Sequence, residues 1–237
     1  MPLIEVTDLR KSYGSRAAVD GVSFTVERGE IFGILGTNGA GKTTTVECLQ
    51  GLRKADSGEI SVLGLDPATD RAALTRRVGV QLQESRLPAK LRVREALELF
   101  ASFYPDPADV DVLLDQLDLR DHQRAYFGKL SGGQKQRVSI ALALVGNPEL
   151  AILDELTTGL DPHARRETWR LVEGVRATGV TVLLVTHFMD EAERLCDRVA
   201  IFDAGRVVAT GTPTELRAAA GASTLDDAFV SLTRSTL

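Results

Sequence analysis

The chain has 237 residues, of which 43% are hydrophobic and 26% charged, and its formal net charge is −5. This length is enough to bury a core without disulfide bonds, and the acidic balance argues against a dedicated nucleic-acid-binding protein. Apolar runs such as 141–145 are far shorter than the ~20 residues of a membrane span, and no signal-like segment opens the chain. We therefore expect a cytoplasmic, reduced protein in which Cys48 and Cys196 are small buried core residues.

Apolar runs and apolar–polar alternation predict strands, in chain order, over 3–9, 22–27, 30–35, 58–62, 78–83, 150–153, 181–185 and 199–202. Helices are predicted over 42–52, 162–177 and 189–195, and helical periodicity runs through 91–145, broken at Pro105 and Pro107. Two apolar helix faces are expected there, one formed by Val93, Ala96, Leu97, Phe100 and Phe103, the other by Val110, Leu113, Leu114 and Leu117. Strands spaced by helices indicate an α/β fold. We expect one domain over 1–237, with a helical subdomain inserted at about 85–145 and a short helical tail over 212–237.

Residues 36–43 read Gly-Thr-Asn-Gly-Ala-Gly-Lys-Thr, which fits G-x-x-x-x-G-K-[ST] and stands between a predicted strand and a predicted helix. Small residues allow a tight loop whose N–H groups face an anion, and the helix adds its positive N-terminal end. Lys42 then supplies a charge for the β- and γ-phosphates, and the Thr43 hydroxyl is placed to bind Mg²⁺. A glycine turn that only caps the helix is the structural alternative, and a dinucleotide site is disfavoured because the loop lacks G-x-G-x-x-G. The loop predicts a nucleoside triphosphate site.

The apolar strand at 150–153 ends in Asp154 and Glu155. At the C-terminal edge of a sheet, beside the phosphate loop, Asp154 can hold Mg²⁺ through water, and Glu155 can orient or deprotonate an attacking water. Acidic residues often simply mark the end of a strand, but the upstream phosphate loop favours the functional interpretation. His187 follows the strand at 181–185, where a lone histidine is more often a cap or a surface residue.

The pentapeptide Leu130-Ser131-Gly132-Gly133-Gln134 lies between the phosphate loop and the acidic strand. A serine and two glycines that open a helix form a second anion site, which suits a γ-phosphate. In this position the pentapeptide is the signature of ATP-binding cassette (ABC) ATPases, and the sequence resembles that family over essentially its whole length. The resemblance implies an α/β P-loop NTPase core, with a RecA-like mixed sheet and an antiparallel β edge, and an inserted α-helical subdomain.

The resemblance also implies how the nucleotide is held. Two cassettes pair head to tail and sandwich two ATP molecules, each between the phosphate loop of one and the signature of the other. Ser131, Gly132 and Gly133 would then act in trans, and Gln134 is also implied to bind the nucleotide. The residues implied to surround the phosphates of the chain's own nucleotide are Gly36, Thr37, Asn38, Gly39, Ala40, Gly41, Lys42, Thr43 and Thr44. Tyr13 matches the aromatic residue that stacks on adenine, with an ordinary strand-edge tyrosine as the alternative.

Further positions match the family one by one. Gln83 matches the glutamine that contacts Mg²⁺ and the attacking water, with Gln81 as the competing candidate. Asp161 matches the loop that crosses the dimer interface, and His187 matches the histidine that contacts the γ-phosphate. The cofactors implied are ATP and Mg²⁺, the catalytic residues are Lys42, Gln83, Glu155 and His187, and the metal-binding residues are Thr43, Gln83 and Asp154. Thr37 and Leu156 stand where the family usually has proline, which puts loop rigidity in question and leaves the catalytic positions filled.

The ending over 225–233 looks like the tail of subunits that serve multidrug, antibiotic or polysaccharide exporters, with an amphipathic helix packed on its own core as the alternative. The resemblance thus implies an ATPase subunit that forms a homodimer, or a heterodimer with a related cassette. It would lie at the inner face of the cell membrane beneath an integral membrane permease, which residues 84–91 are expected to contact. Export of drugs, antibiotics or similar compounds is the leading hypothesis, and import stays open as the alternative. A soluble ATPase acting on ribosomes, DNA or cofactor assembly is disfavoured by the single cassette and the lack of heptads. An inactive regulatory subunit is disfavoured by Glu155 and His187.

Overall fold

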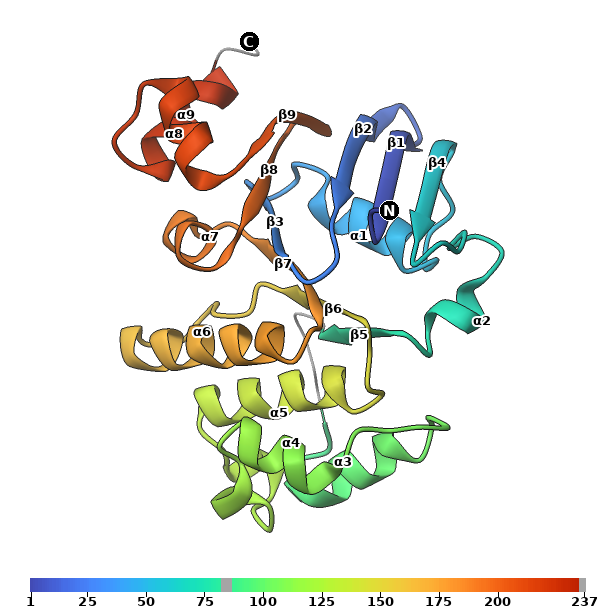
Figure 1. Ribbon diagram of the computed structural model, residues 1–237, viewed down its shortest axis with the longest axis vertical. Coiled ribbons are helices and arrows are strands. Elements are labelled where there is room, and N and C mark those ends of the chain that lie inside the picture. The colour runs from blue at the N-terminus through green and yellow to red at the C-terminus, as the bar shows by residue number, and fades with distance from the viewer. Residues whose placement is uncertain (82–86, 235–237) are drawn as a thin grey trace. The chain divides into compact units, whose positions relative to one another are not determined.

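The structure is a computed structural model that describes residues 1–81 and 87–234 (Figure 1). The chain divides into two units, Met1–Thr75 with Leu183–Leu237 as unit 1, and Arg76–Val182 as unit 2. Unit 1 holds β1 (Ile4–Tyr13), β2 (Arg16–Val26), β3 (Ile31–Gly36), α1 (Lys42–Leu49), β4 (Ser57–Val62), α2 (Arg71–Leu74), most of β7 (Thr181–Thr186), α7 (Met189–Leu195), β8 (Arg198–Asp203), β9 (Arg206–Gly211), α8 (Pro213–Ala220) and α9 (Leu225–Arg234). Unit 2 holds β5 (Val78–Gln81), α3 (Val93–Ala101), α4 (Val110–Gln116), the 3-10 turns η1 (Arg120–His122) and η2 (Phe127–Lys129), α5 (Gly132–Leu144), β6 (Leu150–Asp154) and α6 (Pro162–Ala177).

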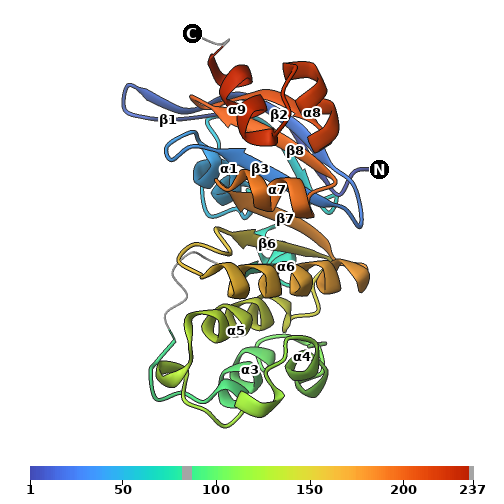
Figure 2. The same ribbon diagram turned by 90° about the vertical axis from the view of Figure 1, so that its left-hand side faces the viewer.

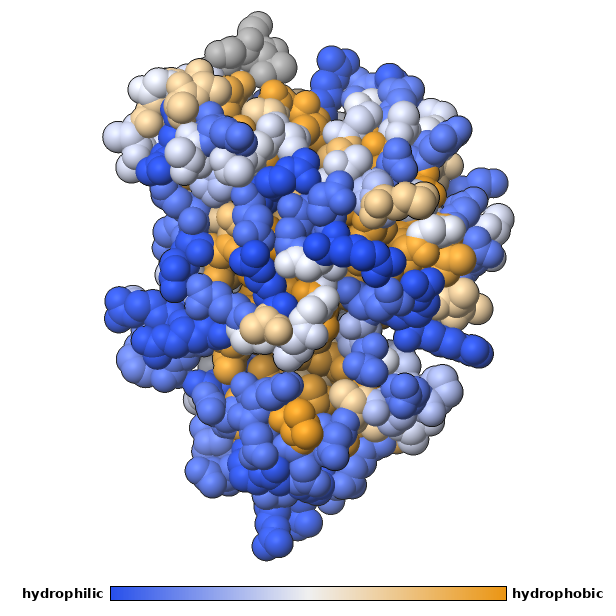
Figure 3. All heavy atoms as spheres, in the orientation of Figure 1, coloured by the Kyte–Doolittle hydropathy of each residue, from blue (hydrophilic) through white to orange (hydrophobic). Residues whose placement is uncertain are grey.

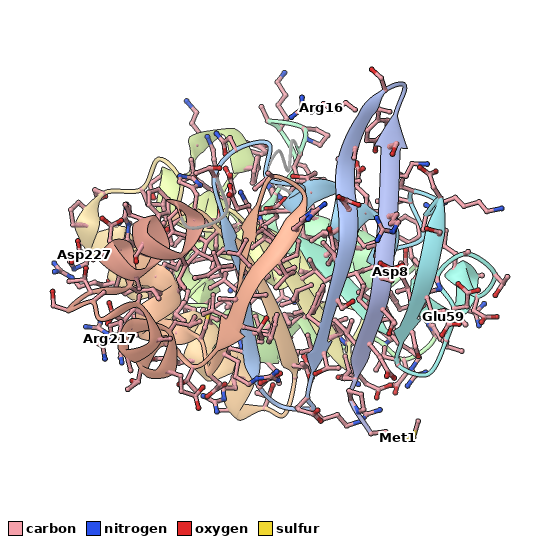
Figure 4. All side chains as sticks on the ribbon, turned by 90° about the horizontal axis from the view of Figure 1, so that it is seen from above. Met1, Asp8, Arg16, Glu59, Arg217 and Asp227 are labelled. Carbon is pink, nitrogen blue, oxygen red and sulfur yellow. The ribbon has the colours of Figure 1, made fainter. Side chains whose placement is uncertain are left out.

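The first sheet of unit 1 is antiparallel, in the strand order β2-β1-β4. Figure 4 shows these three strands side by side, with Asp8 on β1 and Glu59 on β4. Ile4 and Val6 are buried and alternate with exposed residues, as a strand with one face on the core requires, and a register shift after Val6 brings Leu9 onto the buried face. The two long strands β1 and β2 extend beyond the ranges predicted from sequence, because their outer ends form a hairpin through Tyr13 and Arg16.

The second sheet of unit 1 is mixed. β3 runs parallel to β8, and β8 is antiparallel to β9. All six residues of β3 are buried, which explains its continuous apolar sequence. Strand β9 was not predicted from the sequence, because most of its residues are half-buried and give no apolar–polar alternation. The hairpin between β8 and β9 turns at Ala204 and Gly205, which both have positive φ, as a two-residue turn of this kind requires.

Helix α1 is shorter than the predicted 42–52 and ends at Leu49, because Gly51 adopts φ +65°. A Cβ atom on Gly51 would lie 2.2 Å from the carbonyl oxygen of Pro67, so glycine is required at this position. The C-terminal helices α8 and α9 pack against each other (Figure 1), and α9 buries Leu225, Ala228 and Phe229. Its apolar face therefore packs on its own unit, which was the structural alternative for this tail.

In unit 2, β5 and β6 pair in parallel and α3, α4 and α5 pack together (Figure 2). Both predicted apolar faces are confirmed in their central residues, which are Val93, Ala96 and Leu97 on α3, and Leu113, Leu114 and Leu117 on and after α4. The prediction for Phe103 was wrong. Helix α3 ends at Ala101, and Phe103 is 69% exposed, with its ring edge-on to Phe100 at 6.0 Å between centroids.

Within residues 1–81 and 87–234, none of the helices combines the length and apolar character that a membrane span needs. Cys48 and Cys196 are both buried free thiols, as expected, and burial raises the pKa of each. Hydrophilic residues cover most of the face seen in Figure 3, and hydrophobic residues are seen there in separate areas.

Candidate nucleotide-binding site

The phosphate loop of unit 1 connects β3, which ends at Gly36, to α1, which begins at Lys42. Gly41 is the N-cap of α1 and has φ +99°, a backbone conformation that residues other than glycine rarely adopt. A Cβ atom on Gly41 would lie 2.5 Å from the carbonyl oxygen of Ala18, and one on Gly36 would lie 2.5 Å from that of Phe202. Two strands thus approach the loop so closely that only glycine fits at these positions.

The β8–β9 hairpin fixes the loop from outside. The N–H of Gly205 donates to the carbonyl oxygen of Ala40 at 3.1 Å, and the carbonyl oxygen of Gly205 accepts the N–H of Asp20 at 2.8 Å. Gly205, like β9, was not predicted from the sequence to contribute to the site. The available signal was the glycine that follows Ala204 directly after a strand, which is typical of a tight hairpin turn.

Lys42 is 6% exposed, and its ammonium group lies inside the loop. Its Nζ donates to the carbonyl oxygens of Gly36 at 2.7 Å and Thr37 at 3.0 Å. The first turn of α1 carries no acidic residue, so its N-terminal end keeps a positive potential. Thr43 in the same turn is exposed, with its hydroxyl available as a hard oxygen ligand. The loop is built to bind an anion.

Arg16 lies beside this loop, and two predicted site residues, Tyr13 and His187, belong to the same unit. Tyr13 is 43% exposed at the end of β1, with the guanidinium carbon of Arg53 5.1 Å from its ring centroid. Arg16 points its guanidinium toward the loop, where a Cβ atom on Gly39 would lie 3.6 Å from its Nη2. His187 directly follows β7 and tilts its ring over Phe188 at 4.1 Å between centroids. The adenine contact of Tyr13 and the phosphate contact of His187 remain predictions.

In unit 2, β6 ends at Asp154, whose backbone N–H donates to Oε1 of Gln81 at 3.1 Å. Gln81 is only 3% exposed, so β5 holds the end of β6 through a buried amide. Glu155 follows with φ +48°, which is uncommon for a residue with a side chain and concentrates at functional sites. Gln83 lies outside the described residues, so its role stays a prediction, while the competing Gln81 is a neighbour of Asp154.

The signature pentapeptide begins α5. Ser131 is the N-cap, and it forms a capping box with Gln134, in which each backbone N–H donates to the other residue's side chain. The two glycines of the signature, Gly132 and Gly133, leave the start of α5 without side chains next to α6. A Cβ atom on Gly132 would lie 3.6 Å from Leu160 Cδ2, and one on Gly133 would lie 3.4 Å from Ala164 Cβ.

Asp161 is the N-cap of α6, and its carboxylate accepts the backbone N–H groups of His163 at 2.9 Å and Ala164 at 3.0 Å. These backbone hydrogen bonds, that from Ala164 first, hold the pKa of the Asp161 carboxyl below its usual range. The structure thus brings Asp161 and the signature together in unit 2. Between them lies a cavity of about 430 Å³, lined by the signature glycines, Ser131, Gln134, Asp161 and neighbouring polar residues.

The sequence pattern of the family described as "ABC transporter" matches residues 19–158, which is more than half of the chain. The chain belongs to the ABC transporter family. It is an ATP-binding, ATP-hydrolysing cassette. This assignment accounts for a phosphate loop in unit 1 and a signature helix in unit 2, and it confirms the expected family and α/β fold.

Curated relatives of this cassette include two proteins named Nod factor export ATP-binding protein I. The protein from Burkholderia lata is 44% identical over 219 residues, which cover 90% of this chain and 72% of the relative. The protein from Rhizobium meliloti (strain 1021) is 44% identical over 216 residues, which cover 89% of this chain and 64% of the relative. The match therefore spans about two thirds of the length of these relatives.

Solved structures of ATP-binding cassettes have a similar fold. The structure described as the ATP binding subunit of an ABC transporter has a TM-score of 0.86, with 33% identity over 98% of this chain and 99% of that one. The subunit cbiO1 from Clostridium perfringens has a TM-score of 0.84 and 30% identity, covering 92% of this chain and 91% of that one. The ATP-binding cassette MJ0796, solved as a dimer bound to ADP and Pi, has a TM-score of 0.77 and 26% identity, covering 88% and 98%.

Proposed function

We propose that this cassette is the ATP-hydrolysing subunit of an exporter and powers a separate membrane permease. The observation that carries the proposal is the 44% identity to Nod factor export ATP-binding proteins over about nine tenths of the chain. These relatives favour export over import, and they support a role in multidrug resistance only loosely. We treat residues 1–237 as one functional ABC ATPase domain that lies at the inner face of the cell membrane through its permease. Residues 87–91 belong to its permease contact, and residues 84–86 lie outside the described residues.

The working form that we propose is a head-to-tail dimer, formed by two copies of this chain or by this chain and a related cassette. Each unit carries one helix N-terminus suited to an anion, the phosphate loop in unit 1 and the signature in unit 2. A dimer lets the signature of one copy complete the nucleotide site of the other. The MJ0796 cassette, which was solved as a dimer with ADP and Pi, supports this assembly.

The residue roles follow from the chemistry of the groups. Lys42 neutralises the β- and γ-phosphates, Glu155 orients the attacking water and takes up its proton, and His187 contacts the γ-phosphate. Tyr13 stacks on the adenine. Asp161 contributes to the dimer interface from the N-terminus of α6, and Gln83 contacts the attacking water.

We expect Mg²⁺ as a cofactor, with Thr43, Asp154 and Gln83 as the oxygen donors, since hydroxyl, carboxylate and amide oxygens are the kind of ligand that Mg²⁺ prefers. Among residues 1–81 and 87–234 there is no cluster of three or more His, Cys, Asp or Glu side chains that could hold a metal ion by itself. Mg²⁺ is usually held by one or two protein oxygens together with nucleotide phosphates. When bound, Mg²⁺ neutralises charge that develops on the phosphates.

The first test is the substitution Glu155→Gln. We expect ATP binding to be kept and hydrolysis to fall by about 10²-fold or more, because general-base catalysis contributes about that much. The variant should then accumulate as an ATP-bound dimer, measured by size-exclusion chromatography with light scattering. Glu59→Gln, a matched change of an exposed residue on β4, should hydrolyse ATP at the wild-type rate. Wild-type hydrolysis by the Glu155→Gln variant would show that the base is assigned wrongly.

The second test concerns the partner. Affinity purification of the chain from detergent-solubilised membranes should recover an integral membrane protein. Recovery of ribosomes, or of DNA-bound complexes, with no membrane protein would favour the alternative of a soluble non-transport ATPase.

A further inference from the structure

The side chain of Gln134 makes two contacts that together fix its orientation. Its Oε1 accepts the backbone N–H of Ser131 at 2.9 Å, which closes the capping box of α5. Its Nε2 lies 2.9 Å from Nε2 of His122, the last residue of η1. Both contacts are within hydrogen-bond distance, so the amide of Gln134 joins the signature to a side chain outside it.

The direction of each hydrogen bond follows from the backbone. A backbone N–H only donates, so the amide atom that faces Ser131 has to be the oxygen. The other end of the amide is therefore the NH₂ group, which also only donates. Nε2 of His122 has to accept, which requires the neutral imidazole with its proton on Nδ1. Rotating the amide by 180° gives no relief, because it would place the NH₂ group against the N–H of Ser131.

His122 is well placed for this contact. Its backbone N–H donates to the carbonyl oxygen of Leu119 at 2.9 Å, and its own carbonyl oxygen accepts the N–H of Ala125 at 2.9 Å. Its half-buried ring lines the cavity beside the signature. The turn η1 thus presents a ring nitrogen to Gln134 from a backbone that is fixed on both sides.

We propose that His122 is a positioning residue for the signature, which acts by accepting a hydrogen bond from the Gln134 amide in its Nδ1–H form. This inference rests on the proposed head-to-tail dimer, in which Ser131 contacts the nucleotide of the other copy. The oriented amide holds the N–H of Ser131. The Ser131 hydroxyl oxygen accepts the N–H of Gln134 at 3.2 Å, so the hydroxyl proton is left to donate to a phosphate oxygen.

Loss of the His122 contact should affect the signature and not the phosphate loop. Without an acceptor at residue 122, the Gln134 amide loses one of its two anchors and the Ser131 cap loses order. The chain's own phosphate loop keeps its structure, because all of its contacts described above come from unit 1. His122 should therefore affect ATP-driven dimerisation and turnover, and leave the binding of ATP to the free subunit unchanged.

The test uses the Glu155→Gln background, in which the ATP-bound dimer accumulates. Adding His122→Leu should raise the protein concentration needed for half-maximal dimerisation by roughly fivefold or more, since a net hydrogen bond contributes about that factor. Adding His122→Gln in place of His122→Leu should leave dimerisation as in Glu155→Gln alone, because Oε1 of glutamine can take the place of Nε2 of histidine as the acceptor. Adding His122→Asn should weaken dimerisation as His122→Leu does, because the amide of asparagine reaches only the Nδ1 position. Circular dichroism and ATP titration of each variant check that folding and the phosphate loop are intact.

The outcomes separate the two proposals. If Glu155→Gln alone does not dimerise with ATP, the homodimer is refuted, and the tautomer measurement below decides the role of His122 independently of it. If it dimerises and His122→Leu dimerises equally well, the role of His122 is refuted. Equal loss in the Leu and Gln variants would also refute it, because the effect would then be steric.

A second measurement needs no variant that dimerises. Long-range ¹H–¹⁵N spectra of the wild-type subunit report the tautomer of each of its three histidines, and the His122→Gln variant identifies the signals of His122. We expect the neutral Nδ1–H tautomer with an unprotonated Nε2. A dominant Nε2–H tautomer at neutral pH would overturn the inference.

Discussion

At the scale of single residues, the site depends on backbone conformations that most side chains avoid. Gly41 has φ +99° at the start of α1, and Glu155 has φ +48° at the end of β6. The two residues use this conformation differently. Gly41 brings the phosphate loop close to the carbonyl oxygen of Ala18, where no Cβ atom fits, whereas Glu155 accepts the strain with a full side chain.

The substitution Gly41→Ala tests this reading of the loop. We expect it to reduce the free energy of unfolding by about 2 kcal/mol or more, because it combines backbone strain with a clash, and to weaken ATP binding strongly. The matched control is Gly29→Ala, at φ +76° with nothing within 4 Å of its Cβ position. It should cost only the conformational part, about 1 kcal/mol, and leave ATP affinity unchanged. Urea unfolding measures the stability of both variants, and nucleotide titration measures their ATP affinity. An equal loss of unfolding free energy in Gly41→Ala and Gly29→Ala would contradict the proposed clash.

At the scale of elements, the two helices of unit 2 that begin near the cavity are capped by site residues. Ser131 caps α5 and Asp161 caps α6. Arg137 joins the same two helices, since its guanidinium donates to Glu167 on α6 at 2.7 Å and to Asp118 at 3.0 Å. Ser131 and Asp161, which are predicted to contact the nucleotide or the partner cassette, thus also stabilise the helices that they cap.

Asp161 therefore predicts a pH-dependent contribution to stability. Asp161→Ala should lower the unfolding midpoint, and Asp161→Asn should recover most of the loss because asparagine is a good N-cap. Since the folded-state pKa of the Asp161 carboxyl lies below its usual range, its extra stabilisation is present above the usual value and is lost as the pH falls through the lower one.

Urea unfolding across an acidic pH series checks this. The advantage of the wild type over Asp161→Asn should shrink as the pH falls. A difference that is constant with pH would show that the carboxylate charge contributes nothing.

At the scale of the whole molecule, ATP should stabilise the fold through the phosphate loop. At a free ATP concentration about 100 times the dissociation constant, linkage gives about 2.7 kcal/mol. For a chain of this size, this raises the unfolding midpoint by several degrees. The substitution Lys42→Ala should remove most of the shift at the same ATP concentration, as measured by thermal denaturation. A full shift in that variant would contradict the assignment of the loop.

The sequence by itself determined the family, the phosphate loop, the acidic strand end and the signature, because each of these is a local pattern whose residues are close together in the chain. It also determined most strands and helices, since their burial follows a regular period. Only the tertiary structure decided which groups hold these patterns in place. The contact of Gly205 with Ala40, of Gln81 with Asp154 and of His122 with Gln134 each joins segments that are distant in sequence or carry no periodic signal. Such contacts depend on how the chain folds back on itself, and that information is not contained in any single stretch of residues.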